Sequence, residues 1–334
     1  MPREGAKKRL IMLILHILKE YSDEEHQLTE DKIVQIMEEQ YGTVCDIRTV
    51  KNNLNALREL VLQNELGYEI FEENEHYYFS GKFDNAELRM LIDSVLFSKT
   101  LSESQTKSLI EKLKSLGNKY ISAKVSYISS LHELQHADNK QMMISLDKIN
   151  DAIDGKKKIS FVYNEYGDDL KLHPKRDGLK YIVNPYQIVA NNGFFYLVGN
   201  YDKYDNIGHY RIDKMTDVEI LKDKVKPKKK VAEFRQGYSL PKHMAEHIYM
   251  FSGPSVYAKF LIDKDMVGTL IDWFGSGFKI LGKGDEKITV LVSCNESAIF
   301  YWALQYGPYV EVLEPASLRQ KIRDAVCGMK EKYS

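Results

Sequence analysis

Two groups of residues in this 334-residue chain have types and spacings that could do chemistry. The first is the segment His132-Glu133-Leu134-Gln135-His136, which fits the pattern H-E-x-x-H. On a helix this spacing places two imidazoles on one face as zinc ligands, with the glutamate as general base. A zinc peptidase also needs a third ligand, and Ala137 to Met142 contains neither the glycine nor the histidine of one such class. Because short patterns often arise by chance, we expect a solvated helix end and no metal site.

The second group is a polar stripe that follows residue 46. Apolar residues recur there at spacings of three and four, which predicts one buried helix face; they are Ile47, Val50, Leu54, Leu57 and Val61. At about 100° per residue, the opposite side is polar, and it carries Arg48, Thr49, Asn52 and Asn55, with Lys51 flanking them. Arginine and lysine suit guanine and asparagine suits adenine, so this face could contact base edges.

The elements around this stripe are three helices and a hairpin. A first helix is expected from Ala6 to Tyr21, and a second begins after Thr29, a good N-cap, and stops at Gly42. Asp46 is a suitable N-cap for the third helix. Two short strands follow, at 67–72 and 75–79. This order predicts a winged helix-turn-helix that binds duplex DNA. The alternative is an ordinary three-helix bundle with a solvated face.

The predicted wing is acidic, which weakens the DNA interpretation. Between Val61 and Ser80 there is no lysine or arginine, and there are five glutamates: Glu65, Glu69, Glu72, Glu73 and Glu75. Phosphates would repel such a wing. The third helix and the basic N-terminal cluster would therefore have to supply the phosphate contacts; that cluster is Arg3, Lys7, Lys8 and Arg9.

Composition limits the remaining classes. Hydrophobic residues make up 43% of the chain and charged residues 28%, which is ordinary for soluble globular domains. The net charge of −1 excludes a generic polycation. Three distant cysteines, Cys45, Cys294 and Cys327, fit a reducing compartment. His16 interrupts the apolar run that follows Arg9, so we expect a core helix there, not a signal peptide, and a cytoplasmic protein.

The middle of the chain changes from helical to strand-like patterns. Residues 83–141 predict a helical connector, in which Ser102 and Gln105 form a capping box. From residue 142 to 224 a short helix is followed by strands at 159–163, 170–173, 181–189, 194–199 and 208–211. Asn192-Gly193 is a strong hairpin signal, so a small antiparallel barrel is expected. This region is rich in lysine, which suits either an anionic ligand or a solvated face.

A family resemblance becomes specific in this barrel. Phe195-Tyr196-Leu197 is followed by His209-Tyr210-Arg211-Ile212-Asp213-Lys214-Met215, and Asn184-Pro185-Tyr186 precedes both. This ordered set resembles the WYL domain of bacterial transcription regulators. Phe195 stands where the family has its first tryptophan, and Lys214 stands where it has a second arginine.

The resemblance implies an Sm-like or SH3-like barrel that binds a regulatory ligand, either nucleic acid or another anion. Tyr196, Arg211 and Lys214 occupy the motif positions, so Tyr196 would offer a stacking face and Arg211 a bidentate fork for phosphate. The expected ligand-binding set is completed by Tyr186, Lys175 and Arg176. Alternatively, Tyr196 lies in a core strand and Arg211 merely pairs with an aspartate.

A linker is expected at 225–254, where Pro227 precedes the run Lys228-Lys229-Lys230. Residues 255–334 then predict strand, helix, strand, strand, helix, strand and helix, which is a ferredoxin-like order. This part resembles the WCX-type extension found beside WYL domains. Its aromatic residues are expected in a core or an interface; they are Trp273, Phe274, Trp302 and Tyr306.

The sequence therefore predicts a multidomain α+β protein: a winged helix-turn-helix at 1–82, a connector at 83–141, a WYL-like barrel at 142–224, a linker and a WCX-like extension. We expect a homodimeric, non-enzymatic transcription regulator that binds a double-stranded operator and a nucleic-acid or nucleotide-like effector, with no cofactor, no metal and no membrane. Two alternatives remain open. One is a zinc metallopeptidase fused to a DNA-binding segment, and the other is an adaptor that binds single-stranded nucleic acid.

Overall fold

The computed structural model describes residues 4–64, 66–124, 141–235, 237–275 and 277–334, without the side chains of residues 4–8 and 122–124. The chain divides into two compact units, Met1–Asp138 and Asn139–Ser334. The H-E-x-x-H segment at 132–136 lies outside the described residues. No helix of the described part is long and apolar enough to cross a membrane.

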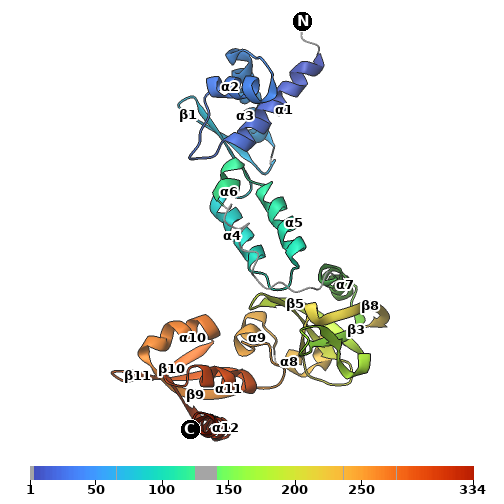
Figure 1. The fold of residues 1–334 in the computed structure, drawn as a ribbon, viewed down its shortest axis with the longest axis vertical. Helices are drawn as coiled ribbons and strands as arrows, with labels where there is room; N and C mark the ends of the chain where they lie inside the picture. The colour runs from blue at the N-terminus through green and yellow to red at the C-terminus, as the bar shows by residue number, and fades with distance from the viewer. Residues whose placement is uncertain (1–3, 65, 125–140, 236, 276) are drawn as a thin grey trace. The chain divides into compact units, whose positions relative to one another are not determined.

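The first unit begins with three helices and a hairpin (Figure 1). These are α1 (Glu4–Tyr21), α2 (Glu30–Tyr41), α3 (Ile47–Gln63), β1 (Glu69–Glu73) and β2 (His76–Ser80). Thr29 and Asp46 cap α2 and α3 as predicted, and Gly42 ends α2 in the left-handed region at φ 58°. Ile47, expected in the buried face of α3, is 46% exposed, because the core under this helix begins one turn later at Val50.

The connector contains α4 (Asn85–Leu96), α5 (Glu103–Lys114) and α6 (Lys119–Lys124). Capping boxes begin both longer helices, one of them the predicted Ser102–Gln105 pair. Leu88, Ile92 and Ile110 form the centre of a small separate core. This core is small because α5 and α6 add only one buried apolar side chain each, Ile110 and Ile121, to those of α4.

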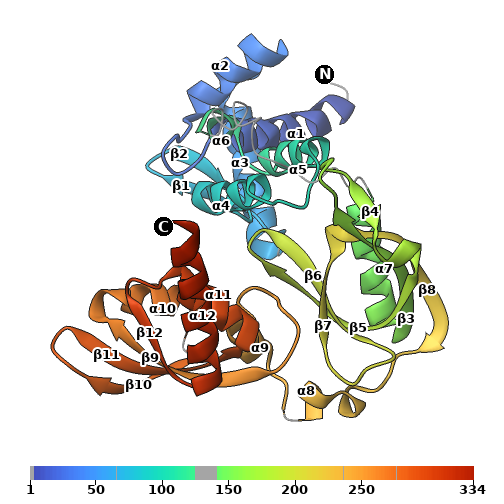
Figure 2. The ribbon, with the colours of Figure 1, turned by 60° about the horizontal axis from the view of Figure 1, so that its bottom comes forward.

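The second unit begins with α7 (Met142–Asp154), which packs against a curved antiparallel sheet (Figure 2). Its strands are β3 (Lys157–Tyr166), β4 (Leu172–Pro174), β5 (Lys180–Asn191), β6 (Phe194–Tyr201), β7 (Gly208–Arg211) and β8 (Met215–Lys224). The order is β4-β3-β5-β6-β7, and β8 pairs with β3. The predicted Asn192-Gly193 turn has positive φ at both residues. Strand β8 was not predicted.

The segment expected to be a linker, residues 225–254, is a packed part of this unit. It contains the short helices α8 (Ala232–Arg235) and α9 (Leu240–Glu246). Val231 and Met250 are buried against Tyr186, Val189 and Val198 of the sheet, so the segment is held by apolar burial.

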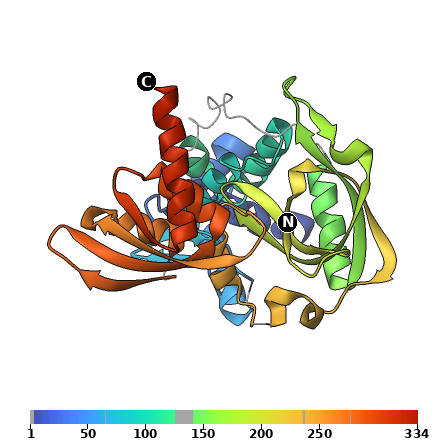
Figure 3. The same ribbon diagram turned by 90° about the horizontal axis from the view of Figure 1, so that it is seen from below.

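The last part consists of β9 (Ser255–Asp263), α10 (Val267–Phe274), β10 (Phe278–Lys283), β11 (Lys287–Asn295), α11 (Glu296–Gln305), β12 (Val310–Glu314) and α12 (Ala316–Lys332). The sheet is antiparallel with the order β10-β11-β9-β12. Helices α11 and α12 lie together over one face of it (Figure 3). Phe274 and Trp302 belong to the core beneath, as expected, and Trp273 donates its indole N–H to Tyr306 Oη at 3.0 Å.

Candidate functional sites

The exposed side of α3 carries part of the polar set predicted to contact DNA. Val50, Leu54 and Leu57 are buried in the core, and the side facing away from them is solvent-exposed. Arg48, Lys51, Asn52 and Asn55 are exposed, and Arg9 at the N-terminal helix is exposed as well. Arg3 and the side chains of Lys7 and Lys8 lie outside what the structure describes.

Thr49, a predicted base-contacting residue, takes part in the cap of α3. Its backbone N–H donates to Asp46 Oδ1 at 2.8 Å, and its hydroxyl donates to Asp46 Oδ2 at 2.7 Å. These two bonds satisfy the first turn of α3 and hold the pKa of Asp46 below its ordinary value. Because the hydroxyl proton is engaged by Asp46, the half-buried Thr49 hydroxyl can contact a base only as an acceptor.

Lys51 is held by two carboxylates. Its Nζ lies 3.6 Å from Glu30 Oε1 and 3.5 Å from Glu75 Oε1, and these charges raise the pKa of Lys51. Glu30 also accepts the Tyr77 hydroxyl at 3.1 Å. The network therefore joins α2, α3 and the hairpin. To bind a phosphate, Lys51 must either break one of these two ion pairs or contact the phosphate and the carboxylates together.

The acidic hairpin is partly neutralised by the same helix. Arg58, about two turns after Lys51 along α3, forms an ion pair with Glu72 of β1. Sequence reasoning treated the hairpin glutamates as free repulsive charges. The structure pairs Glu72 and Glu75 with cations of α3, so part of that repulsion is already cancelled within the unit.

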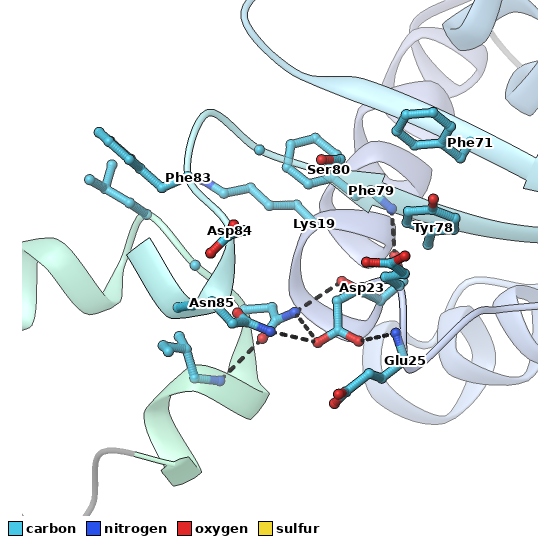
Figure 4. A pocket seen from close by; sticks show the side chains of 18 of the residues that line it. Lys19, Asp23, Glu25, Phe71, Tyr78, Phe79, Ser80, Phe83, Asp84 and Asn85 are labelled. Carbon is cyan, nitrogen blue, oxygen red and sulfur yellow. Dashed lines mark hydrogen bonds between the residues drawn. The ribbon is translucent and has the colours of Figure 1, made fainter. Parts of the chain in front are cut away.

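Beneath the hairpin, the first unit contains a cavity of about 690 Å³ (Figure 4). Asp23 lines it and accepts hydrogen bonds from His26 at 2.7 Å, Asn118 at 3.0 Å and Asn85 at 3.3 Å. Burial raises the pKa of Asp23, but the bonds from Asn118, His26 and Asn85 outweigh it, and the pKa falls below its ordinary value. The polar groups around Asp23 are hydrogen-bonded to it, and this network links the connector to the end of α1.

In the second unit, strand pairing brings the central motif residues together. Tyr196 on β6 lies directly opposite Arg211 on β7, so both side chains lie on the same face of the sheet. Arg211 donates from Nε and Nη2 to Asp213 at 3.1 and 2.6 Å, and its guanidinium lies 3.5 Å from the centroid of the Phe194 ring. The Asp213 side chain is 0% exposed and that of Arg211 is 24% exposed. Arg211 therefore forms the expected pair with an aspartate, and its Nη1 takes no part in that pair.

Other charged groups surround this pair. Burial and the charge of Arg211 lower the pKa of Lys214, and Lys175 donates to Glu165 at 2.5 Å nearby. Burial also raises the pKa of the Tyr196 hydroxyl. Arg211, Lys214 and the Tyr196 hydroxyl are thus close enough to influence one another electrostatically.

Two predicted ligand residues lie elsewhere. Tyr186 is buried, and its hydroxyl donates to the Lys226 carbonyl at 2.8 Å, so it belongs to the core between the sheet and the 225–254 segment. Arg176 lies 5.4 Å from the Tyr181 ring centroid and lines a separate cavity of about 190 Å³. Sequence reasoning missed Phe194 and Tyr163, whose hydroxyl accepts the Arg211 backbone N–H at 3.2 Å. Only the strand register, which the sequence does not state, brings these residues to Arg211.

Metal ligands are not gathered anywhere in the described ranges: no group of three or more histidine, cysteine, aspartate or glutamate residues there could hold a metal ion.

The chain is a multidomain α+β protein with several separate sheets. It contains two domains of known families: residues 145–220 match the WYL domain family, and residues 254–329 match the WCX domain family.

Among the solved structures that match the chain, two are similar over most of its length. Proteasome accessory factor B/C (PafBC) of Arthrobacter aurescens is 15% identical, with a TM-score of 0.30; the match covers 97% of this chain and 50% of that one, so this chain spans half its length. The structure of a CRISPR Cas-related protein is 16% identical with a TM-score of 0.42, covering 90% of this chain and 76% of the other. No curated protein matches the chain.

Proposed function

We propose that this protein is a transcription regulator without catalytic activity, which binds operator DNA as a cytoplasmic homodimer and responds to an anionic effector at its WYL domain. In this proposal residues 1–82 form a winged helix-turn-helix, 83–141 a connector, 142–224 an Sm-like barrel with 225–254 packed on it, and 255–334 a ferredoxin-like extension. The observation that carries the DNA assignment is the exposed polar face of α3, in a helix–helix–hairpin order, joined to a WYL domain.

The DNA contacts are assigned to Arg48, Asn52 and Asn55, with Lys51 and the basic N-terminus on phosphates. An asparagine side chain matches the N6 and N7 groups of adenine, and each such bidentate contact is worth about 1–3 kcal/mol. Two protomers would place two α3 helices on half-sites one helical turn apart.

The test is to select a duplex from a random-sequence library with the purified protein and to measure its affinity by fluorescence anisotropy. Arg48→Ala and Asn52→Ala should each weaken binding about 5- to 150-fold. Lys107→Ala is the matched control, because Lys107 is an exposed cation of α5 in the same unit, paired with Glu103. Binding within twofold of the parent in the combined Arg48/Asn52 variant would refute the assignment.

The effector site is assigned to Tyr196, Arg211 and Lys214, with Lys175 at its edge. Asp213 binds Nε and Nη2 of the guanidinium, so Nη1 is the group proposed to donate to a phosphate, and the Tyr196 ring is proposed as a stacking face. Neither alternative function, the zinc peptidase or the single-strand adaptor, is supported by the WYL and WCX matches.

A short single-stranded oligonucleotide is the first effector probe. Arg211→Lys keeps the charge but removes the planar fork, so it should weaken oligonucleotide binding at least tenfold and abolish the change in duplex affinity that the oligonucleotide causes. Lys180→Ala is the control, because Lys180 is exposed in the same barrel and pairs with Glu219. An unchanged response in Arg211→Lys would count against this site.

A further inference from the structure

Residues of the 225–254 segment line a further cavity, of about 560 Å³, whose lining does not include Tyr196 or Arg211. Its walls come from three places in the second unit: Asn206 of the barrel, helices α8 and α9, and the strands β9 and β11 of the last sheet. Glu233, Tyr238, His243 and Glu246 are among the lining residues.

Two polar atoms in this wall lack partners. Glu233 Oε1 accepts the Ile207 backbone N–H at 3.0 Å, but its Oε2 is shielded from solvent and has no hydrogen-bond partner among the described residues. The same is true of the Tyr238 hydroxyl. Buried polar groups are almost always hydrogen-bonded, and an unmade bond costs about 1–3 kcal/mol, so two such atoms in one wall indicate that a partner is missing.

Three histidines behind the cavity do not supply positive charge. His209 Nε2 and His243 Nε2 are 2.8 Å apart, a distance at which the N–H of one ring donates to the lone pair of the other. Burial, with the charge of His247, lowers the pKa of His243 to about 3, and burial with both neighbours lowers that of His209 to about 2. Burial also lowers the pKa of His247, whose Nδ1–H donates to the Phe251 carbonyl at 2.9 Å. All three rings are neutral at pH 7.

The cavity is therefore rich in negative charge. Glu246 accepts hydrogen bonds from Ser293 at 2.9 Å and Ser255 at 3.2 Å, and Lys242, its nearest cation, is 3.9 Å away and largely exposed. Together with Glu233, the lining of the cavity thus contains two carboxylates and one lysine, whose charge is screened by solvent. A buried carboxylate with an unpartnered oxygen is costly unless a cation or an N–H donor compensates it.

We propose that this cavity is a binding site for a small organic cation that carries an ammonium or guanidinium group. The N–H groups of the ligand lie against Glu233 and Glu246, and the Tyr238 and Tyr257 rings cover its apolar part. An organic cation is favoured over a metal ion because the described residues form no group of ligands that could hold one. The site joins the WYL barrel to the WCX sheet, and it differs from the proposed effector site in its lining residues and in the charge of its ligand.

The experiment is a thermal-shift and calorimetric titration of the full-length protein with agmatine, arginine, spermidine and choline, and with citrate and AMP as anionic probes. At least one of the four cations should raise the melting temperature of the protein and give a heat of binding in the calorimetric titration. Neither citrate nor AMP should bind at this site. Glu233→Gln should weaken that binding at least tenfold. The amide oxygen of Gln still accepts the Ile207 N–H, so this variant keeps its fold, which circular dichroism checks.

Two further variants distinguish the outcomes. Glu246→Gln should also weaken the cation, whereas Glu219→Gln, an exposed glutamate of β8 paired with Lys180, should leave it unchanged. Arg211→Lys should bind the cation as the parent does, so a failure of the effector site would not affect this result. The proposal is overturned if none of the four cations binds, or if Glu233→Gln and Glu246→Gln both bind the cation as tightly as the parent.

Discussion

The ion pair between Lys51 and Glu75 gives the sharpest test of how α3 meets DNA. Glu75 lies at the tip of the hairpin with φ 63° and is 72% exposed, and its carboxylate lies 3.5 Å from Lys51 Nζ. Glu75→Gln removes the charge while keeping the size and the polar character of the side chain. On the proposed function, this single change should tighten duplex binding, because it both releases Lys51 and removes a repulsive charge from the wing.

The expected size of the gain follows from Coulomb's law. Two unit charges about 4 Å apart interact by about 1 kcal/mol in water, which corresponds to a factor of about five in affinity. Glu30 still holds Lys51 at 3.6 Å, so the release is incomplete, and we expect a three- to tenfold gain per protomer. If Lys51 gains one phosphate contact, the slope of log affinity against log salt should steepen by about 0.9.

The assay is fluorescence anisotropy with a fixed duplex at several salt concentrations. Glu69→Gln is the matched control, since Glu69 is an exposed glutamate of the same hairpin that no described ion pair joins to α3. A cycle with Lys51→Gln isolates the coupling between Lys51 and Glu75. Lys51→Gln should cost more affinity in the Glu75→Gln background than in the parent.

Two results would refute the reasoning. If Glu75→Gln binds no tighter than the parent, the wing charge does not oppose DNA. If Glu69→Gln gives the same gain and the same salt slope, the effect is one of net charge, and Lys51 is not released.

Three further predictions concern stability. Arg211→Ala removes the ion pair and two hydrogen bonds from the buried Asp213 carboxylate and should cost about 3–5 kcal/mol of unfolding free energy in a urea titration. Adding Asp213→Asn should recover most of this loss, and an equal loss in both variants would contradict the reasoning. The folded-state pKa of His243 is about 3, below the unfolded value near 6.5, so the unfolded state takes up the proton first as the pH falls. The free energy of unfolding should therefore drop by about 2 kcal/mol between pH 7 and pH 5. His243→Phe should remove this part of the pH dependence, whereas the control His76→Gln, at an exposed histidine, should keep it. Asn118→Ala removes hydrogen bonds to Ser22 and Asp23 and should lower the free energy of unfolding by about 1–3 kcal/mol. Backbone amides at the end of α1 should then exchange their hydrogens faster, and unchanged exchange rates would contradict this role of Asn118.

Elements with local signals were predictable from the sequence. Thr29, Gly42 and Asp46 act within one turn of their own helix, so their types alone locate the ends of α2 and α3. The Asn192-Gly193 turn is equally local. The engagement of Thr49 by Asp46 is also a local effect, and the N-cap pattern contained the signal for it.

The features that the sequence did not reveal depend on tertiary pairing. Strand β8 has charged residues at its exposed positions and no turn signal, and only its pairing with β3 defines it as a strand. The lysine run at 228–230 favoured a linker, although Val231 and Met250 bury apolar surface on the sheet. Likewise, the partners of Lys51 come from α2 and the hairpin, and no spacing along the chain predicts that contact.

Cations at both proposed anion sites are already paired, but the two pairs should behave differently. Lys51 is bound by Glu75 in high dielectric, where such a pair is worth at most about 1 kcal/mol, so a phosphate competes with it readily. Arg211 is bound by a fully buried Asp213 through two hydrogen bonds, and separating them would leave a charge in the core. That pair should therefore persist on binding and orient the guanidinium toward the ligand. Removing the carboxylate should have opposite effects at the two sites: Glu75→Gln strengthens duplex binding, whereas Asp213→Asn weakens effector binding because the fork loses its orientation.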